Sequence, residues 1–154
     1  LQKTKRVGIS WKSVVNIYGK LKSLEIYDFL KIFNKDRTII NLQYGETERE
    51  ILELKANNYN IFSFSGFDLF NDFDSLISIL KSLDVFVTVS NSTAHFAGAL
   101  GVPTILISPK NSSRYYYWDY ENEKTPWYKS VHIIRVNNNI SQAMDRVNNL
   151  IDSI

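Results

Sequence analysis

Apolar residues along this chain fall into short runs of two alternating kinds. One kind is rich in β-branched and aromatic residues and has the length of a buried strand, about four to eight residues. The clearest example is VFVTVS, which follows Asp84 and is apolar at almost every position, as in strands that are covered on both faces. The predicted strands are Arg6–Trp11, 37–43, Asn60–Phe64, 85–90, 103–108 and 131–136.

The other kind of run has apolar residues at helical spacing. The predicted helices are 23–33, 46–56, 75–83, His95–Leu100 and a terminal helix from about Ser141. We expect Ser23 and Asp74 to cap two of them, because short polar side chains satisfy the first free N–H groups. Strand and helix therefore alternate along most of the chain. This order predicts one α/β domain with a doubly wound, mostly parallel sheet and right-handed crossovers.

Composition narrows the class of protein. The 154 residues are 44% apolar with 22% charged residues, which suits one globular domain. The net charge of +2 comes from scattered residues, so nucleic acid and anionic membrane surfaces are not expected partners. The absence of cysteine excludes a disulfide scaffold and a thiolate metal site. No apolar run approaches the roughly 20 residues of a transmembrane helix, so no transmembrane segment is expected.

The loops after the strands are the places to look for function, because ligands of such sheets bind outside the carboxyl ends of the strands. The stretch VTVSNSTAHFAGALGVPTILIS, residues 87–108, has small polar residues between a buried strand and a helix. Free N–H groups and the helix dipole favour an anion there, and small hydroxyl residues let a phosphate approach. The alternative is that Ser92 and Thr93 only cap the helix. The sequence leaves both readings open.

The loop after the first strand, GISWKS, supplies a possible phosphate ligand in Lys12. The alternative is a solvated lysine beside a tryptophan that covers the core. No GxGxxG or Walker motif is present, which argues against a nicotinamide dehydrogenase and a P-loop ATPase. Asp72-Phe73-Asp74 opens a predicted helix instead of ending a strand, so we interpret it as a cap and not as a metal clamp.

Several of these stretches together resemble a known family. LDVFVTVSNSTAHFAGALGVPTILIS resembles the donor-binding signature of bacterial glycosyltransferases related to lipopolysaccharide heptosyltransferases, including the heptosyltransferase-like domains attached to tetratricopeptide repeats. VGISWKS, NLQYGE, DFDSLISILKSLD and PWYKSVHIIRV resemble further parts of the family in the same order. The resemblance covers nearly the whole chain. It implies a Rossmann-like, nucleotide-sugar-binding C-terminal half of a two-domain GT-B glycosyltransferase.

The resemblance also implies a binding site for a nucleoside-diphosphate sugar. Lys12 and His95 are expected to stabilise the leaving diphosphate in place of a metal, and no cofactor is expected. The base is expected between the Ser65–Asp74 loop and the end of the Gln43 strand. Many relatives carry Asp-Thr where this chain has Ser90-Asn91, which removes a carboxylate. The expected binding residues are Ser10, Trp11, Lys12, Gln43, Glu46, Asn91, Ser92, Thr93, Ala94 and His95.

On this reading residues 1–154 form a single donor-binding domain that lacks the N-terminal acceptor domain, so it should bind a donor without turning it over. The intact enzyme would be an inverting, metal-independent glycosyltransferase that acts on a glycan, lipid or protein in the cytoplasm, including the inner face of the membrane. The alternative is a non-catalytic nucleotide-binding or degenerate GT-B-like module. A flavodoxin-like or response-regulator domain fits the fold alone, but SWK replaces the acidic pair or phosphate-binding loop after the first strand.

Aromatic residues are concentrated between Tyr115 and Tyr128. We expect Trp127 and Tyr128, next to Pro126, to cover a sheet edge. Part of the Tyr115–Trp118 run is expected to contact a partner domain or an acceptor, since aromatic rings are common at interfaces.

Overall fold

The computed structural model describes residues 4–14, 16–109, 116–118 and 122–154. Among these residues six strands form one sheet in the order β3-β2-β1-β4-β5-β6, and every neighbouring pair is parallel. The predicted doubly wound parallel sheet is therefore confirmed. The strands are β1 Lys5–Ser10, β2 Arg37–Asn41, β3 Ile61–Ser63, β4 Val85–Val89, β5 Thr104–Pro109 and β6 Val131–Val136.

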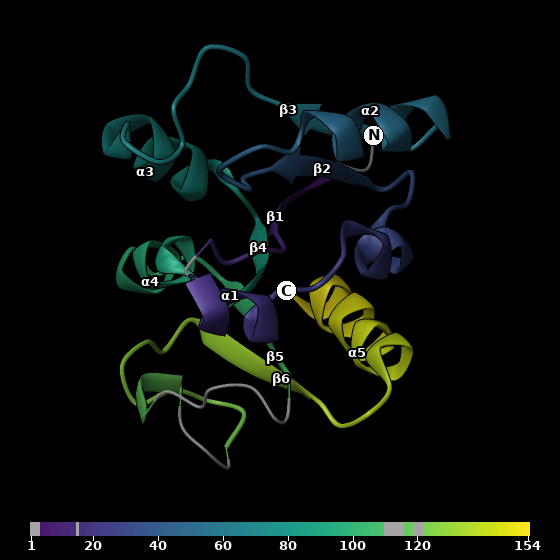
Figure 1. Cartoon of the computed structure of the whole chain (residues 1–154). Coiled ribbons are helices and arrows are strands. Elements are labelled where there is room, and N and C mark those ends of the chain that lie inside the picture. The colour runs from purple at the N-terminus through teal and green to yellow at the C-terminus, as the bar shows by residue number, and fades with distance from the viewer. Residues whose placement is uncertain (1–3, 15, 110–115, 119–121) are drawn as a thin grey trace.

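Helices cover both faces of this sheet (Figure 1). One face packs against α2, α5 and a 3-10 helix, η1, and the other against α3 and α4. No helix in the described ranges is long and apolar enough to cross a membrane. The helices are α1 Asn16–Lys22, η1 Ile26–Ile32, α2 Glu48–Ala56, α3 Phe73–Ser82, α4 Ser92–Ala99, η2 Tyr116–Trp118 and α5 Ile140–Ser153.

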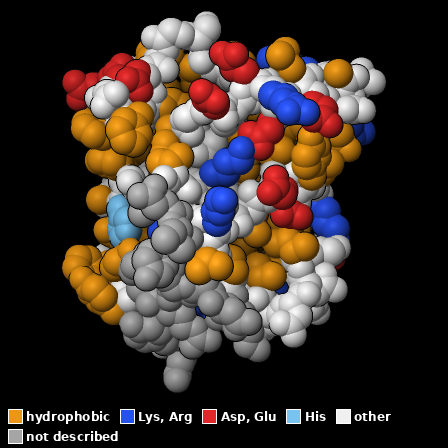
Figure 2. Space-filling view, in the orientation of Figure 1, with side chains coloured by type: hydrophobic (Ala, Val, Ile, Leu, Met, Phe, Trp, Pro, Cys, Tyr) orange, Lys and Arg blue, Asp and Glu red, His pale blue; other side chains and the backbone are white. Residues whose placement is uncertain are grey.

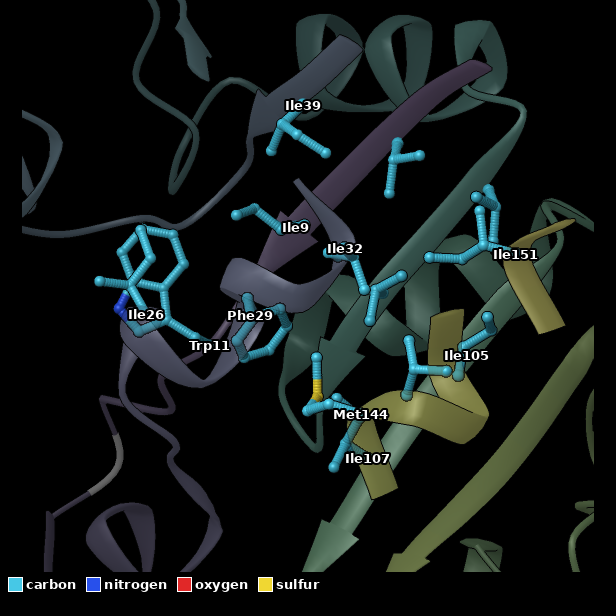
Figure 3. Close-up of a cluster of buried hydrophobic side chains, with 14 of the residues drawn as sticks. Ile9, Trp11, Ile26, Phe29, Ile32, Ile39, Ile105, Ile107, Met144 and Ile151 are labelled. Carbon is cyan, nitrogen blue, oxygen red and sulfur yellow. The ribbon is translucent and has the colours of Figure 1, made fainter. Parts of the chain in front are cut away.

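Successive side chains of each strand point to opposite faces of the sheet. In β2, Ile39 packs with the cluster under α5, and Ile40 packs with the cluster under α3. Figure 3 shows the first cluster, where Ile9 of β1 and Phe29 of η1 lie among isoleucines and Met144 of α5. Each such side chain contributes about 1.5–3 kcal/mol by leaving water. The core therefore fixes the strand ends that carry the candidate site.

Several predicted helix starts are wrong. The segment after Ser23 begins at Ile26 as a 3-10 helix, with Glu25 in a capping box, and Ser23 Oγ instead donates to Gly19 O at 2.8 Å. Asp72 caps α3 by accepting from Ser75 N at 3.0 Å, so Asp74 lies in the first turn. Sequence reasoning also missed α1, whose central Gly19 weakens the helical pattern.

The aromatic segment near the end differs in part from its prediction. Trp127 is 59% exposed and does not cover a sheet edge, whereas Trp118 is 3% exposed and belongs to the core. Tyr128 packs against the cluster that includes Val131 and Ile133 of the edge strand β6, as predicted, and its ring also lies beside Gly98 of α4. Tyr116 is exposed and contacts the Trp127 ring at 6.1 Å between centroids. Tyr115 and Tyr120 lie outside the described residues.

Gly98→Ala should destabilise the protein, although alanine is the better helix former. A Cβ at this position would lie 2.5 Å from Cγ of Tyr128 and 3.0 Å from its Cβ. Overpacking of this kind costs about 1–3 kcal/mol, while the helix propensity gained is about 1 kcal/mol. Urea denaturation should show a net loss of stability. In a Tyr128→Gly background both the ring and its Cβ are gone, and the same substitution should become stabilising; a loss of equal size there would contradict the packing explanation.

Candidate functional site

Three buried polar side chains meet at the carboxyl ends of β1, β2 and β4. Gln43 Oε1 accepts hydrogen bonds from Ser10 Oγ at 3.0 Å, from the backbone N–H of Trp11 at 2.8 Å and from that of Lys12 at 2.6 Å. Asn91 Nδ2 donates to Ser10 Oγ at 2.8 Å and to the carbonyl of Lys12 at 3.3 Å. We call these contacts the Ser10–Gln43–Asn91 network. It joins the loops after three strands into one unit.

The remaining polar atoms of the network also have partners within the protein. Gln43 Nε2 donates to Tyr44 O at 2.9 Å, and Asn91 Oδ1 accepts from Ala94 N at 3.1 Å. Asn91 is therefore the N-cap of α4, in place of the predicted Ser92 and Thr93. Sequence reasoning assigned Ser10, Gln43 and Asn91 to ligand contact. In the structure their side chains bind each other and position the loops around the site.

The first turn of α4 faces the same edge of the sheet. Ser92 is exposed there, Thr93 is buried, and the N–H of Ala94 is already bonded to Asn91. The first N–H groups of a helix have no intrahelical acceptor, which leaves those of Ser92 and Thr93 to bind an anion.

The backbone carbonyl of Lys12 accepts from Asn91, the N-cap of this turn, and the lysine side chain is paired with an acid that sequence reasoning missed. Its Nζ is 2.7 Å from each carboxylate oxygen of Glu50, which stands in the first turn of α2. The lysine side chain is 35% exposed, so the pair is partly solvated. The position of Glu50 in the chain could have indicated this pair. α2 follows β2, the strand next to β1, so the first turn of α2 reaches the loop after β1.

Trp11 does not reach the site. Its ring is 0% exposed and packs in the core beside Ile26 and Phe29 (Figure 3). The alternation of strand residues explains this, because Trp11 continues the inward-facing series of Val7 and Ile9. We therefore remove the Trp11 side chain from the set of expected ligand contacts, and its backbone N–H remains bonded to Gln43.

His95 lies one turn into α4 within a cluster of aromatic rings. The imidazole stacks on Trp118 with 4.6 Å between centroids, and its Nδ1 is 3.1 Å from the hydroxyl oxygen of Tyr128. Burial lowers the pKa of His95, with a further contribution from the charge of Lys22, so the ring is neutral at neutral pH. When the Tyr128 hydroxyl donates to Nδ1, the ring proton is on Nε2, and that tautomer can donate to a ligand.

Ser90 occupies the position where the family resemblance leads us to expect an acid. It is buried, and its hydroxyl accepts a hydrogen bond from Nε1 of Trp118 at 2.9 Å. The serine thus holds the aromatic ring on which His95 stacks. Its role in this chain is to orient that cluster.

Two neighbouring cavities open beside this edge. The larger, about 490 Å³, lies between the segment after β2 and the loop after β3, where the sequence predicts the base pocket, and its walls include Tyr44, Phe67 and Phe70. The smaller, about 380 Å³, shares Tyr44 and Phe70 and reaches Ser92 of α4. Glu48 lines the larger cavity, whereas Glu46 is exposed outside it. Within the described part of the chain, no three His, Asp or Glu side chains gather where they could hold a metal ion.

Comparison with solved structures relates this fold to one group of enzymes. E. coli ADP-heptose lipopolysaccharide heptosyltransferase II matches 99% of this chain at 13% identity with a TM-score of 0.65, and the match covers 48% of that enzyme. The chain has the fold of one half of a GT-B heptosyltransferase. E. coli heptosyltransferase WaaC with bound ADP matches 99% of this chain at 14% identity, also with a TM-score of 0.65, over 45% of WaaC.

Sequence comparison relates the chain to a different protein. Protein FlbA of Caulobacter vibrioides is 28% identical over 129 residues, which are 82% of this chain and 21% of FlbA. No protein-family model matches the sequence. The chain spans just under half of these heptosyltransferases and about a fifth of FlbA.

Gln43→Met should destabilise the protein and loosen the loop after β1. Methionine preserves the volume of the side chain but removes the acceptor for three donors, and each buried donor left without a partner costs about 1–3 kcal/mol. Hydrogen exchange should show faster exchange of the Trp11 and Lys12 amides, and denaturation should show lower stability. Gln142→Met, at an exposed position of α5, is the matched control and should leave both measurements unchanged. Unaltered protection of both amides in Gln43→Met would contradict the network.

Proposed function

We propose that this chain is the donor-binding domain of a GT-B glycosyltransferase and that it binds a nucleoside-diphosphate sugar at the carboxyl edge of its sheet. The observation that supports this most is that Asn91 both caps α4 and bonds to the backbone of Lys12. One side chain thereby brings the positive end of a helix and a lysine loop together. A helix N-terminus beside a cation is a suitable environment for a diphosphate.

In this proposal the diphosphate lies over the first turn of α4. The N–H groups of Ser92 and Thr93 and the exposed Ser92 hydroxyl donate to it, and Lys12 neutralises part of its charge. The base occupies the 490 Å³ cavity between Tyr44 and Phe70, whose rings offer stacking surfaces. Glu48 is better placed than Glu46 to accept from a ribose hydroxyl, because it lines that cavity.

The reaction we propose is inverting glycosyl transfer without a metal ion. As the bond to the sugar breaks, negative charge grows on the departing diphosphate, and preorganised donors stabilise it. Lys12, the first-turn amides of α4 and the ring N–H of His95 would take that role. The acceptor and the general base belong to a second, N-terminal domain outside this chain. We place the reaction in the cytoplasm or at the inner face of its membrane, on a glycan, lipid or protein acceptor.

One observation favours the alternative, a GT-B-like module without transferase activity. Glu50 already forms an ion pair with Lys12, so the positive charge of the site is neutralised by another residue of the protein. A diphosphate must either displace this carboxylate or share the ammonium group with it. Nucleotide affinity tests whether the site binds a donor, and turnover in a longer protein tests transferase activity.

The chain should bind ADP, UDP or GDP with a dissociation constant in the millimolar range or tighter. Lys12→Met should weaken binding about tenfold, since a point charge at a diphosphate contributes about 1.4 kcal/mol or more. Isothermal titration calorimetry measures both values. Lys35→Met, at an exposed lysine next to β2, is the matched control and should bind like wild type. If none of the three nucleotides binds at millimolar concentration, the donor site is disproved for this chain.

A longer protein that includes the acceptor domain should lose turnover when the donors to the leaving group are removed. Lys12→Ala and His95→Ala are each expected to lower kcat by about 100-fold, which corresponds to roughly 3 kcal/mol. Steady-state kinetics, with thermal denaturation to verify folding, provides the test. His132→Ala on β6 is the control for loss of a histidine. Activity that a chelator abolishes and manganese restores would contradict the metal-free mechanism, and wild-type turnover in both variants would contradict the leaving-group role.

A further inference from the structure

Exposed apolar side chains are concentrated at one corner of the molecule. Five large ones, between 47% and 67% exposed, come from α2, β3, the loop after β3 and the start of α3. We call this group the Phe surface. It consists of Leu52, Phe62, Phe67, Phe70 and Phe73.

Ring contacts and shared cavity walls join the members of the Phe surface. Phe64 lies between Phe62 and Phe67, with centroid distances of 5.0 and 5.6 Å. Leu52, Phe67 and Phe70 line the larger cavity, and Phe70 and Phe73 line the smaller one. Figure 2 shows hydrophobic side chains gathered beside acidic ones at the upper left, where Figure 1 has α3. Contiguous exposed apolar patches of this kind mark binding surfaces.

The edge position of β3 explains why these rings are uncovered. β3 has three residues and pairs only with β2 in the described sheet. Phe62 therefore lies on the edge strand, on the face that α3 and α4 cover, but outside the area that these helices bury. Burying such rings in an interface is favourable, because it removes apolar area from water.

The charge around the Phe surface is strongly negative. Residues 44–74 contain seven acidic and two basic residues, a net charge of −5, in a chain whose net charge is +2, and the pairing of Glu50 with Lys12 reduces the local charge to −4. Asp68 accepts hydrogen bonds from the side chain of Asn71 and the backbone of Phe70, and these bonds lower its pKa. The pKa of Asp72 is lowered by its bonds from Ser75. The acidic residues are Glu46, Glu48, Glu50, Glu53, Asp68, Asp72 and Asp74.

We propose that the Phe surface binds a segment of a partner protein in which Lys or Arg side chains flank bulky apolar anchors. Charge complementarity selects this partner, because the acidic rim repels anionic lipids and nucleic acids and attracts a basic chain. The aromatic side chains provide the apolar contact area, as the central residues of protein interfaces do. The proposal goes beyond donor binding, and the protein contact shares Leu52, Phe67 and Phe70 with the wall of the larger cavity.

Two synthetic amphipathic peptides test the proposal. They have the same length and the same leucine and phenylalanine positions, and every polar position is Lys in one and Glu in the other. Fluorescence anisotropy with this chain should show the Lys peptide binding at least about tenfold more tightly than the Glu peptide, and its affinity should fall as salt screens the charges. Equal affinity for both peptides would overturn the proposal.

Two variants assign the binding to the Phe surface. Phe62→Thr removes an exposed ring from β3 and should weaken the Lys peptide about fivefold or more. Asp74→Asn, at an exposed position of α3, should weaken binding of the Lys peptide at low salt and reduce the dependence of its affinity on salt. Trp127→Ser, at an equally exposed ring elsewhere, is the control and should bind like wild type. Wild-type affinity in Phe62→Thr, or a chain that self-associates through this surface in sedimentation experiments, would overturn the proposal.

Both variants lie outside the lining of the two cavities, so nucleotide affinity should be unchanged in them. Failure of the nucleotide to bind wild type would disprove the donor site and leave the peptide result intact. Failure of the Lys peptide would disprove the partner surface and leave the nucleotide result intact.

Discussion

The Ser10–Gln43–Asn91 network is the interaction on which the candidate site depends. A single amide oxygen, on a Gln43 side chain that is 2% exposed, satisfies a hydroxyl and two backbone N–H groups of the loop after β1. A buried polar group of this kind is stable only when it is fully bonded, since an unpaired donor costs more than a hydrogen bond contributes. The three loops are therefore held in one arrangement. Any ligand that binds here meets a preformed edge.

That constraint explains which residues remain available for chemistry. The network uses the polar atoms of Ser10, Gln43 and Asn91, and what it leaves facing outward is the Lys12 side chain and the first turn of α4. Lys12 is in turn paired with Glu50 in a partly solvated environment, where an ion pair contributes about 1 kcal/mol or less. A diphosphate carries more charge than one carboxylate and is expected to compete for this ammonium group.

The opposite side of α4 shows how the aromatic segment supports the same turn. Trp118 donates to Ser90 and stacks on His95, while Tyr128 holds Nδ1 of His95 and packs against Gly98. The ring orientation of His95 is thus fixed by side chains that are far away in the sequence. The site has a rigid network on one side of α4 and a packed aromatic cluster on the other, with the exposed Phe surface beyond the cavities.

The alternation of strands and helices, and with it the parallel sheet and the edge where the site lies, could be predicted from the sequence, because the hydrophobic period is a local property of the chain. The sequence also pointed to the loops after β1 and β4. The burial of Trp11, the capping of α3 by Asp72 instead of Asp74 and the pairing of Glu50 with Lys12 became visible only in the folded chain. The physical reason is that a hydrogen-bond or ion-pair partner is chosen by the packing of elements distant in sequence. Position in the strand-end loops and the family resemblance therefore suggested Ser10, Gln43 and Asn91 as ligand contacts, and the packed fold shows that their side chains bind each other.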